Sequence, residues 1–246
     1  MNLKIIRGAF LNPFELQNYK DLLTDPKIDI EIISSKRPMA NVSTFPVTKL
    51  WSPTDLPNFP FKFPILNRIF IDAQLLLGLP KKLLNTDIAH VAETYFGYTY
   101  QAIMAKRRGE VKKIISTVWE TIPFNNQSLK GRKMIKKYAL ENIDHFLAVT
   151  QKAKACLLKE GIKENKITVI PMGVDLERFK PRSGKKNLRD INILCVARLT
   201  PEKGIEDLVN AFLEIKKEYS NVRLTLIGNG PLKKDFHGTK NISIRS

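Results

Sequence analysis

Arg198 and Lys203 could bind an anion, because they flank a predicted strand-to-helix turn in INILCVARLTPEKG (191–204). The apolar run is typical of a buried strand, which would deliver the arginine at its end and the lysine just before the helix. An Arg guanidinium can hold phosphate oxygens in a bidentate way, and a Lys ammonium adds a compact second charge. Together they could balance a diphosphate. Cations beside a turn are also common as solvent-exposed residues of a helix start, and the spacing alone leaves both interpretations open.

The sequence lacks the glycine-rich motifs of two other phosphate-binding classes. No GxGxxG follows a predicted strand and no GxxxxGK[ST] segment is present, which disfavours dehydrogenases and P-loop NTPases. Cys156 falls in a predicted helix and Cys195 in a predicted strand, without a CxxC spacing. Two buried, reduced thiols are therefore favoured over a disulfide or a metal site.

The formal net charge of +17 is unevenly distributed. Residues 1–100 carry 11 Lys and Arg against 9 Asp and Glu, whereas residues 101–246 carry 30 against 15. Such a field favours an anionic partner, either a phosphorylated substrate, an anionic membrane surface or nucleic acid. The clusters AKRRGEVKK (105–113) and KGRKMIKK (130–137) lack interleaved aromatic residues that would stack bases, and solvated helix faces explain them equally well. A basic nucleic-acid-binding α/β module is thus an alternative function, but no nucleic-acid partner is expected.

The elements that must position these residues alternate along the chain. Runs rich in Ile, Val and Leu predict strands, and the segments between them predict helices, up to residue 170. Continuous apolar strands separated by helices indicate a parallel α/β sheet that is covered on both faces. The predicted strands are 3–8, 28–34, 45–51, 87–93, 112–119, 145–150 and 166–170, and the predicted helices are 14–23, 66–79, 97–108, 129–142 and a helix capped by Thr150.

The regular alternation stops after residue 170 and restarts at residue 191. Residues 171–190 contain prolines, glycines and many charges, which is typical of a linker. Residues 191–246 then supply a strand, a helix from Gly204 to about Tyr219 and a second strand at 222–228. The sequence therefore predicts a Rossmann-like domain over 1–170 and a partial second Rossmann-like domain over 191–246.

Three blocks resemble, in their order and spacing, the family 4 retaining glycosyltransferases, which have the GT-B fold. They are VIPMGVDLERFKP (169–181), ILCVARLTPEKGIEDLVNAF (193–212) and VRLTLIGNGPLKKDF (222–236). RGAFLNPFELQNY (7–19) and DIAHVAETYFGYTYQA (87–102) resemble the family more loosely. The resemblance implies two Rossmann-like domains, with the acceptor on the N-terminal one and the nucleotide sugar on the C-terminal one. It also implies sugar transfer to a saccharide or lipid-linked acceptor with retention, without a metal or another cofactor.

The resemblance assigns donor-binding roles to two cations and three glycines. Arg198 and Lys203 match the cations that clasp the donor diphosphate, where they would stabilise the charge of the leaving group. Gly8 would let the first loop approach the donor, although it is equally typical of a strand end. Gly228 and Gly230 in IGNGP match a loop near the donor, although both are also typical turn residues.

Three residues of the N-terminal half are candidates for a catalytic role. Glu93 and Glu120 follow predicted strands, at the sheet edge where ligands bind, and could contact sugar hydroxyls or be exposed loop acids. His90 lies inside an apolar strand, where a histidine is usually a hydrogen-bonded core residue. The family's sugar-contacting His generally lies two positions later, where this chain has Ala92.

The second domain departs from the family pattern. Family members continue with strands that carry a Glu-x7-Glu pair for the donor's ribose and sugar, and no such pair follows Ile227. We therefore expect a fragment or a shortened protein, with residues 191–246 loosely ordered and the activity at this length in doubt.

The sequence predicts a cytoplasmic protein. No apolar stretch approaches the ~20 residues that cross a bilayer, and the first residues lack the pattern of a secretory signal. Residues 59–84 mix apolar and basic side chains in a way that would suit peripheral contact with an anionic membrane, at the inner face of the cell membrane. An ordinary packed helix with a proline-rich entry is the alternative for this segment.

Overall fold

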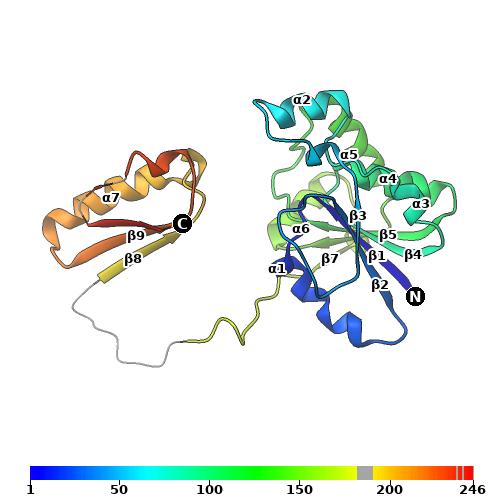
Figure 1. Ribbon diagram of the computed structural model, residues 1–246, viewed down its shortest axis with the longest axis horizontal. Helices are drawn as coiled ribbons and strands as arrows, with labels where there is room; N and C mark the ends of the chain where they lie inside the picture. The colour runs from blue at the N-terminus through cyan, green and yellow to red at the C-terminus, as the bar shows by residue number, and fades with distance from the viewer. Residues whose placement is uncertain (182–190, 237, 240, 246) are drawn as a thin grey trace. The chain divides into compact units, whose positions relative to one another are not determined.

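The computed structural model describes residues 1–181, 191–236, 238–239 and 241–245 (Figure 1). The chain divides into two compact units, Met1–Phe179 and Lys180–Ser246. This division falls within the segment predicted as a linker, of which residues 182–190 lie outside the described part. Each unit has its own parallel sheet and its own buried apolar cluster.

The first unit contains a seven-stranded sheet in the order β3-β2-β1-β4-β5-β6-β7, and all of its neighbouring strands are parallel. This confirms the predicted α/β architecture. The strand order reverses between β1 and β4, and ligands of such sheets bind beyond the carboxyl ends of the strands at this reversal. The strands are β1 (Asn2–Gly8), β2 (Asp29–Ser35), β3 (Val47–Leu50), β4 (Thr86–Ala92), β5 (Val111–Val118), β6 (His145–Ala148) and β7 (Ile167–Val169).

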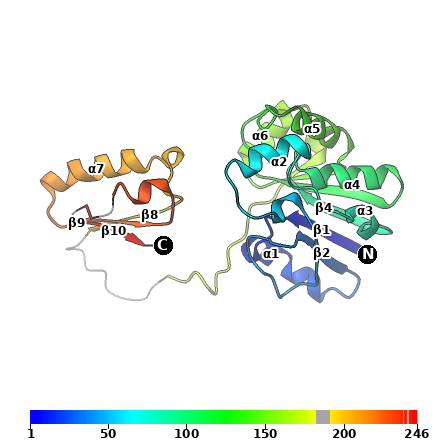
Figure 2. The ribbon, with the colours of Figure 1, turned by 45° about the horizontal axis from the view of Figure 1, so that its top comes forward.

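Helices cover both faces of this sheet. α4 and α5 lie on one face and α1 with the 3-10 helix η1 on the other (Figure 2). The helical elements are α1 (Pro13–Leu16), η1 (Gln17–Thr24), η2 (Pro53–Asp55), α2 (Lys62–Ile69), α3 (Leu79–Lys82), α4 (Gly97–Arg107), α5 (Lys130–Asn142), α6 (Gln151–Lys159) and η3 (Glu164–Lys166). The predicted cap of α6 is confirmed, because the Thr150 hydroxyl accepts a hydrogen bond from the backbone of Ala153 at 3.0 Å.

Two predicted helices are wrong in detail. The segment 14–23 is one short α-helical turn followed by η1, and the helix expected at 66–79 ends at Ile69. The backbone turns at Ile71, which has a φ of +67°. Buried Asp72 then accepts hydrogen bonds from the backbone N–H groups of Gln74 and Gly97, at 3.0 and 2.9 Å, so this segment is held in a non-helical conformation.

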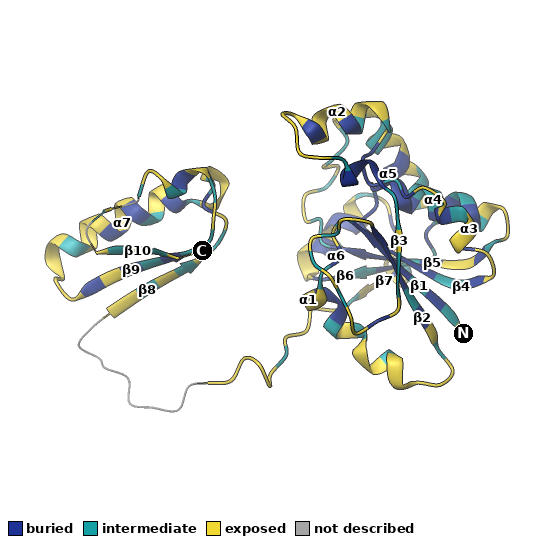
Figure 3. Ribbon diagram, viewed as in Figure 1, coloured by how far each residue is buried: buried dark blue, intermediate teal, exposed yellow. Residues whose placement is uncertain are grey.

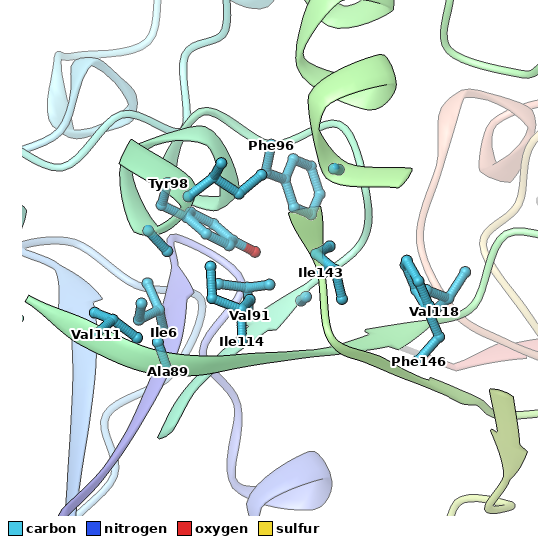
Figure 4. Packing of buried hydrophobic residues seen from close by; sticks show 14 of the residues in the cluster. Ile6, Ala89, Val91, Phe96, Tyr98, Val111, Ile114, Val118, Ile143 and Phe146 are labelled. Carbon is cyan, nitrogen blue, oxygen red and sulfur yellow. The ribbon is translucent and has the colours of Figure 1, made fainter. Parts of the chain in front are cut away.

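Successive residues of β1 point into two different cores. Ile5 and Ile6 are both fully buried, and each belongs to a separate apolar cluster because neighbouring side chains of a strand face opposite sides of the sheet. In the larger cluster, Ile6, Val91 and Ile114 of the strands pack beneath Tyr98 at the start of α4 (Figure 4). The sheet is therefore rigidly packed close to its ligand-binding edge.

The second unit is a three-stranded parallel sheet with one long helix. The strands β8 (Ile191–Val196), β9 (Val222–Ile227) and β10 (Ile242–Arg245) lie in the order β10-β9-β8. The helix α7 (Ile205–Glu218) buries Val209 and Phe212 in one cluster with Leu224 and Leu226. Two short 3-10 helices, η4 (Pro201–Lys203) and η5 (Pro231–Lys233), complete the described part of this unit.

β10 was not predicted, because four residues of alternating polarity give a weak pattern. Residues 191–246 were expected to be loosely ordered, but their described part packs around a buried cluster. One face of β8 is exposed to solvent: the exposed fraction is 60% for Leu194 and 69% for Val196.

Both cysteines are free thiols, but Cys195 is only half-buried rather than buried as expected. Within the part of the chain that the structure describes, no helix has the length and apolar character needed to cross a membrane.

Candidate functional site

A cavity of about 500 Å³ opens in the first unit at the reversal of the strand order. Its walls come from the segments that follow β1, β4 and β5, where Phe10, Glu93 and Trp119 lie. Phe96 and Tyr95 add further aromatic surface. The cavity thus occupies the position where an open parallel sheet binds its ligand.

Glu93 is the buried carboxyl of this cavity. It directly follows β4, in a left-handed conformation with a φ of +56°, and only 6% of the residue is exposed. Its Oε1 accepts a hydrogen bond of 2.9 Å from the backbone N–H of Trp119, and its buried Oε2 has no hydrogen-bond partner within the described residues. Burial, reinforced by the nearby charge of Glu120, raises the pKa of Glu93 to about 7.

Arg7 is the cation of the cavity wall, and its charge is already compensated. Only 1% of the residue is exposed. Its Nε donates to Glu15 at 2.5 Å, one terminal nitrogen donates to the Tyr19 hydroxyl at 3.1 Å, and the other donates to the carbonyl of His90 at 3.1 Å. The arginine therefore fixes the segment after β1 against β4. It was not among the residues predicted for the site.

His90 is buried and does not line the cavity. Its Nε2 is 2.8 Å from the Thr117 hydroxyl, and 4% of the residue is exposed. Burial and the charge of Arg7 lower the pKa of His90 well below its ordinary value, so the ring is neutral. The structure thus gives His90 a place in the core, although it was one of the catalytic candidates.

Glu120 organises the loop after β5. Its Oε1 accepts from the backbone N–H groups of Thr121 and Ile122, both at 2.9 Å. Its Oε2 accepts from the side-chain amides of Asn125 and Asn126, at 2.8 and 3.0 Å. Its carboxylate is therefore occupied by the loop, and the residue is not part of the cavity wall.

Gly8 is required by close packing at the end of β1. Its φ is +52°, and a Cβ at this position would lie 2.6 Å from Gln74 Oε1 and 3.1 Å from the Tyr98 ring. The same Gln74 oxygen accepts a hydrogen bond of 3.2 Å from the backbone of Ala9. Packing alone therefore explains this glycine, and its donor role remains a proposal.

The start of the block 169–181 forms another part of the cavity wall, through Met172 and Gly173. The backbone N–H of Gly173 donates to Asn18 Oδ1 at 2.9 Å, and its carbonyl accepts from the Gln17 side chain at 2.8 Å. These contacts attach the segment to η1. The motif VIPMGVDLERFKP was the only sequence signal for this wall.

Arg198 and Lys203 lie on one exposed turn of the second unit. Arg198 follows β8, and its side chain is 72% exposed and pairs with Glu202 at 3.2 Å. Lys203 ends η4, and Gly204, with a φ of +64°, leads into α7. An exposed ion pair of this kind contributes at most ~1 kcal/mol, so a ligand could displace Glu202 from Arg198.

Gly228 and Gly230 hold the backbone on either side of Arg198. A Cβ on Gly228 would lie 1.8 Å from the carbonyl oxygen of Ala197, and one on Gly230 would lie 2.2 Å from that of Leu199. Both glycines are therefore needed for the close approach of two backbone segments. The two glycines therefore lie next to Arg198, the predicted phosphate-binding residue, and packing accounts for them without a ligand contact.

In the residues that the structure describes, no cluster of His, Cys, Asp and Glu side chains could hold a metal ion. The absence of a cofactor remains a prediction.

Two family models match the chain. Residues 23–178 match the model described as Glycosyltransferase Family 4, and residues 177–240 match the model described as Glycosyl transferases group 1. Together these matches extend over both units of the chain.

Curated relatives include two named transferases. A phosphatidylinositol N-acetylglucosaminyltransferase protein of Arabidopsis thaliana is 27% identical over 153 residues, which are 58% of this chain and 32% of the relative. The putative colanic acid biosynthesis glycosyltransferase WcaL of Escherichia coli K12 is 28% identical over 139 residues, which are 54% of this chain and 33% of the relative. The aligned part of this chain spans about a third of the length of these relatives.

Solved structures show the same fold. Anabaena Alr3699/HepE in complex with UDP and glucose superimposes with a TM-score of 0.69 and 12% identity, over 99% of this chain and 68% of that chain. The lipopolysaccharide outer core galactosyltransferase WaaB in its apo form gives a TM-score of 0.63 and 16% identity, over 99% of this chain and 67% of that chain. The fold is therefore of the GT-B type.

Proposed function

The chain belongs to Glycosyltransferase Family 4, whose model matches residues 23–178, and from this we propose that it transfers a sugar from a nucleotide sugar to a saccharide or lipid-linked acceptor. The main support for the proposal is the cavity where the strand order reverses between β1 and β4. The curated relatives of the chain bear the names of glycosyltransferases, which agrees with it. The UDP and glucose bound to Alr3699/HepE support a nucleotide sugar as donor. The family assignment replaces the nucleic-acid-binding alternative.

The second unit would bind the donor. Arg198 and Lys203 present two cations on one surface turn after β8, where they are accessible to a diphosphate. Departure of a nucleoside diphosphate develops negative charge on the leaving oxygen, and fixed cations stabilise that charge as it forms. This role requires neither a metal nor another cofactor. Retention of the anomeric configuration belongs to the same proposal and rests on the family.

The first unit would bind the acceptor in its cavity. The aromatic side chains of Phe10, Phe96 and Trp119 offer apolar surface to the faces of a sugar or polyol ring, and Glu93 offers a carboxyl. Ligand sites commonly combine an apolar lining with a few polar groups that fix orientation. The cavity has this composition.

The helix α2 would bring the enzyme to the membrane that holds a lipid-linked acceptor. Phe63 and Ile69 of α2 and Phe61 just before it are exposed by 52%, 66% and 77%, and Arg68 of α2 is exposed too. Lys81 is exposed in α3, and Figure 3 shows that much of the surface of α2 is exposed. Apolar side chains combined with basic ones match the chemistry of an anionic bilayer surface. We place the protein in the cytoplasm, peripherally on the inner face of the cell membrane.

A transfer assay tests the proposed function. The 246-residue chain and a fusion that adds the C-terminal residues of a curated relative are incubated with UDP-glucose or UDP-N-acetylglucosamine and with saccharide or lipid acceptors. Nucleotide release that depends on the acceptor, together with a glycosylated product, is the expected result for a transfer-competent form. Release of no nucleotide from any donor by either protein would contradict the proposal.

A further inference from the structure

We propose that Glu93 determines acceptor specificity, by binding a hydroxyl group of a neutral polyol ring in the cavity, while the cavity disfavours anionic rings. The inference rests on the proposed function, since it assigns the ligand of the acceptor-binding part of the same site. Four features of the cavity carry it: the backbone of Glu93, its unpaired carboxyl oxygen, the charges of the wall, and the aromatic surface.

The backbone of Glu93 is held in a conformation that favours glycine. A non-glycine residue with a φ of +56° is uncommon, and such residues concentrate at functional sites. The conformation is fixed by three hydrogen bonds: the Glu93 N–H donates to the carbonyl of Thr117 at 2.8 Å, and its carbonyl accepts from the hydroxyls of Ser116 and Thr99, at 3.1 and 3.3 Å. Glycine would fit this position without strain, so the presence of glutamate indicates a use for the side chain.

The Glu93 carboxyl has an unused hydrogen-bonding position. Its Oε1 is bound to the N–H of Trp119, whereas its Oε2 is buried without a hydrogen-bond partner in the described part of the chain. Buried polar atoms nearly always have a partner, and the side chain forms part of the cavity wall. A ligand hydroxyl in the cavity would supply that partner. Because a hydroxyl can both donate and accept, it suits the carboxyl in either protonation state.

The charges of the wall favour a neutral ligand. The lining residues that can carry a charge near pH 7 are Arg7, Glu15 and Glu93. Arg132 and Arg178 do not belong to the lining, and their guanidiniums lie against the rings of Tyr95 and Phe14. The Arg7 guanidinium is buried and already bound to Glu15, to Tyr19 and to two backbone carbonyls, so it is not available to an anion. Glu93 would repel a phosphate once ionised. The cavity therefore differs from the exposed cation pair of the second unit, which suits a diphosphate.

The remaining surface of the cavity suits the apolar faces of a ring. Phe10 and Phe96 lie with their ring centroids 5.4 Å apart, and the half-buried Trp119 belongs to the same wall. A cavity of about 500 Å³ is within the usual range for a small-molecule site. The aromatic surface would position the ring, and Glu93 would then distinguish its hydroxyl groups.

The test uses Trp119 as a reporter. The chain has 2 Trp residues, so a Trp51→Phe background leaves Trp119 as the single fluorophore beside the cavity. Myo-inositol, methyl glucoside and methyl glucoside 6-phosphate are the probes, titrated at pH 7. We expect the neutral polyols to change the fluorescence with saturation, and we expect the phosphorylated probe to bind about tenfold more weakly or worse.

Variants separate ligand binding from folding. Glu93→Gly should weaken polyol binding by about tenfold or more. The melting temperature should change little, because relief of the left-handed conformation offsets the loss of the hydrogen bond that the Trp119 N–H donates to Glu93. Glu93→Gln keeps an acceptor for the Trp119 N–H and a polar atom toward the cavity, and should keep polyol binding within about threefold. Glu164→Gln, which changes an exposed carboxylate outside the cavity wall, is the control and should bind as the wild type does.

Three results would overturn the inference: no saturable polyol binding by the wild type, equal binding by Glu93→Gly, or tighter binding of the phosphorylated probe. If any of these occurs while the transfer assay still yields product, the role of Glu93 is refuted and the proposed function stands. Loss of both polyol binding and transfer would refute both.

Discussion

Glu93 and Trp119 are joined by a hydrogen bond of 2.9 Å, in which the backbone N–H of Trp119 donates to Glu93 Oε1. This bond connects the end of β4 to the residue that follows β5, and both residues belong to the wall of the cavity. One carboxyl oxygen thus serves the fold, while the other is left for a ligand. The two roles belong to different atoms of the side chain: Oε1 accepts from the Trp119 N–H, and the unpaired Oε2 is the atom that a ligand hydroxyl would bind.

The first prediction concerns the pH dependence of stability. Burial raises the pKa of Glu93 from an ordinary value of 4.5 to about 7, so the folded state binds the proton more tightly than the unfolded state does. The free energy of unfolding should therefore fall as the pH rises from 4.5 to 7, by about 3 kcal/mol, and should then level off. Glu93→Gln should lose this slope. Urea unfolding followed by Trp119 fluorescence at a series of pH values measures it, and parallel profiles for the two proteins would exclude Glu93 as the cause.

The second prediction concerns a buried ion pair between α5 and the end of α6. Lys136 Nζ lies 2.6 Å from Glu160 Oε1, and the two side chains are only 1% and 2% exposed. Lys136→Met leaves the carboxylate buried without its counter-charge and should lower the free energy of unfolding by about 3–5 kcal/mol.

Adding Glu160→Gln to Lys136→Met should restore most of that loss, because the amide oxygen still accepts the hydrogen bond that Phe124 N–H donates at 2.7 Å. Lys137→Met, at the neighbouring exposed position, is the control and should change stability little. Urea unfolding followed by circular dichroism measures all three. A double variant no more stable than Lys136→Met alone would show that the charge pairing is not what matters.

Strands were predictable from the sequence because each is a short apolar run bounded by turn residues. All seven strands of the first unit lie within one or two residues of their predicted positions. The helix expected at 66–79 failed for a physical reason. The apolar residues there have helical spacing, but buried Asp72 pairs with Arg132, a residue 60 positions later in the chain. The distance from Arg132 Nη2 to Asp72 Oδ1 is 2.8 Å. No local pattern encodes such a contact.

The site was only partly predictable. Glu93 and Arg198 follow strands and Lys203 lies on the same turn as Arg198, so the rule that ligands bind at strand ends selected all three as candidates. The structure places Glu93 in the cavity wall, and the donor role of Arg198 and Lys203 stays a prediction. Arg7 and Met172 reach the cavity wall only through tertiary packing. The sequence also could not distinguish Glu93 from Glu120, because both follow strands and only the structure shows that the loop occupies Glu120.

The third prediction concerns the donor cations. In a transfer-competent form of the protein, Arg198→Ala and Lys203→Ala should each reduce transition-state stabilisation by about 2–4 kcal/mol, measured as kcat/KM for the nucleotide sugar. Arg198→Lys should restore only part of it, because the bidentate fork is lost. Lys217→Ala, an exposed cation at the other end of α7 that pairs with Glu214, is the control. Turnover equal to the wild type in both alanine variants would show that Arg198 and Lys203 do not bind the donor diphosphate and are ordinary residues of a helix start.

The last prediction concerns membrane contact through α2. Phe61 and Ile69 are 77% and 66% exposed, so serine at these positions should leave the stability of the fold nearly unchanged. The double variant Phe61→Ser with Ile69→Ser should nevertheless lose sedimentation with vesicles of phosphatidylglycerol, because apolar insertion and attraction to anionic lipid act together. Leu23→Ser is the control, since Leu23 is 39% exposed on η1, at the opposite face of the sheet. Binding should weaken with rising salt and should be weak with phosphatidylcholine alone. A wild type that stays in the supernatant at low salt, or a double variant that sediments as the wild type does, would remove α2 as the membrane contact.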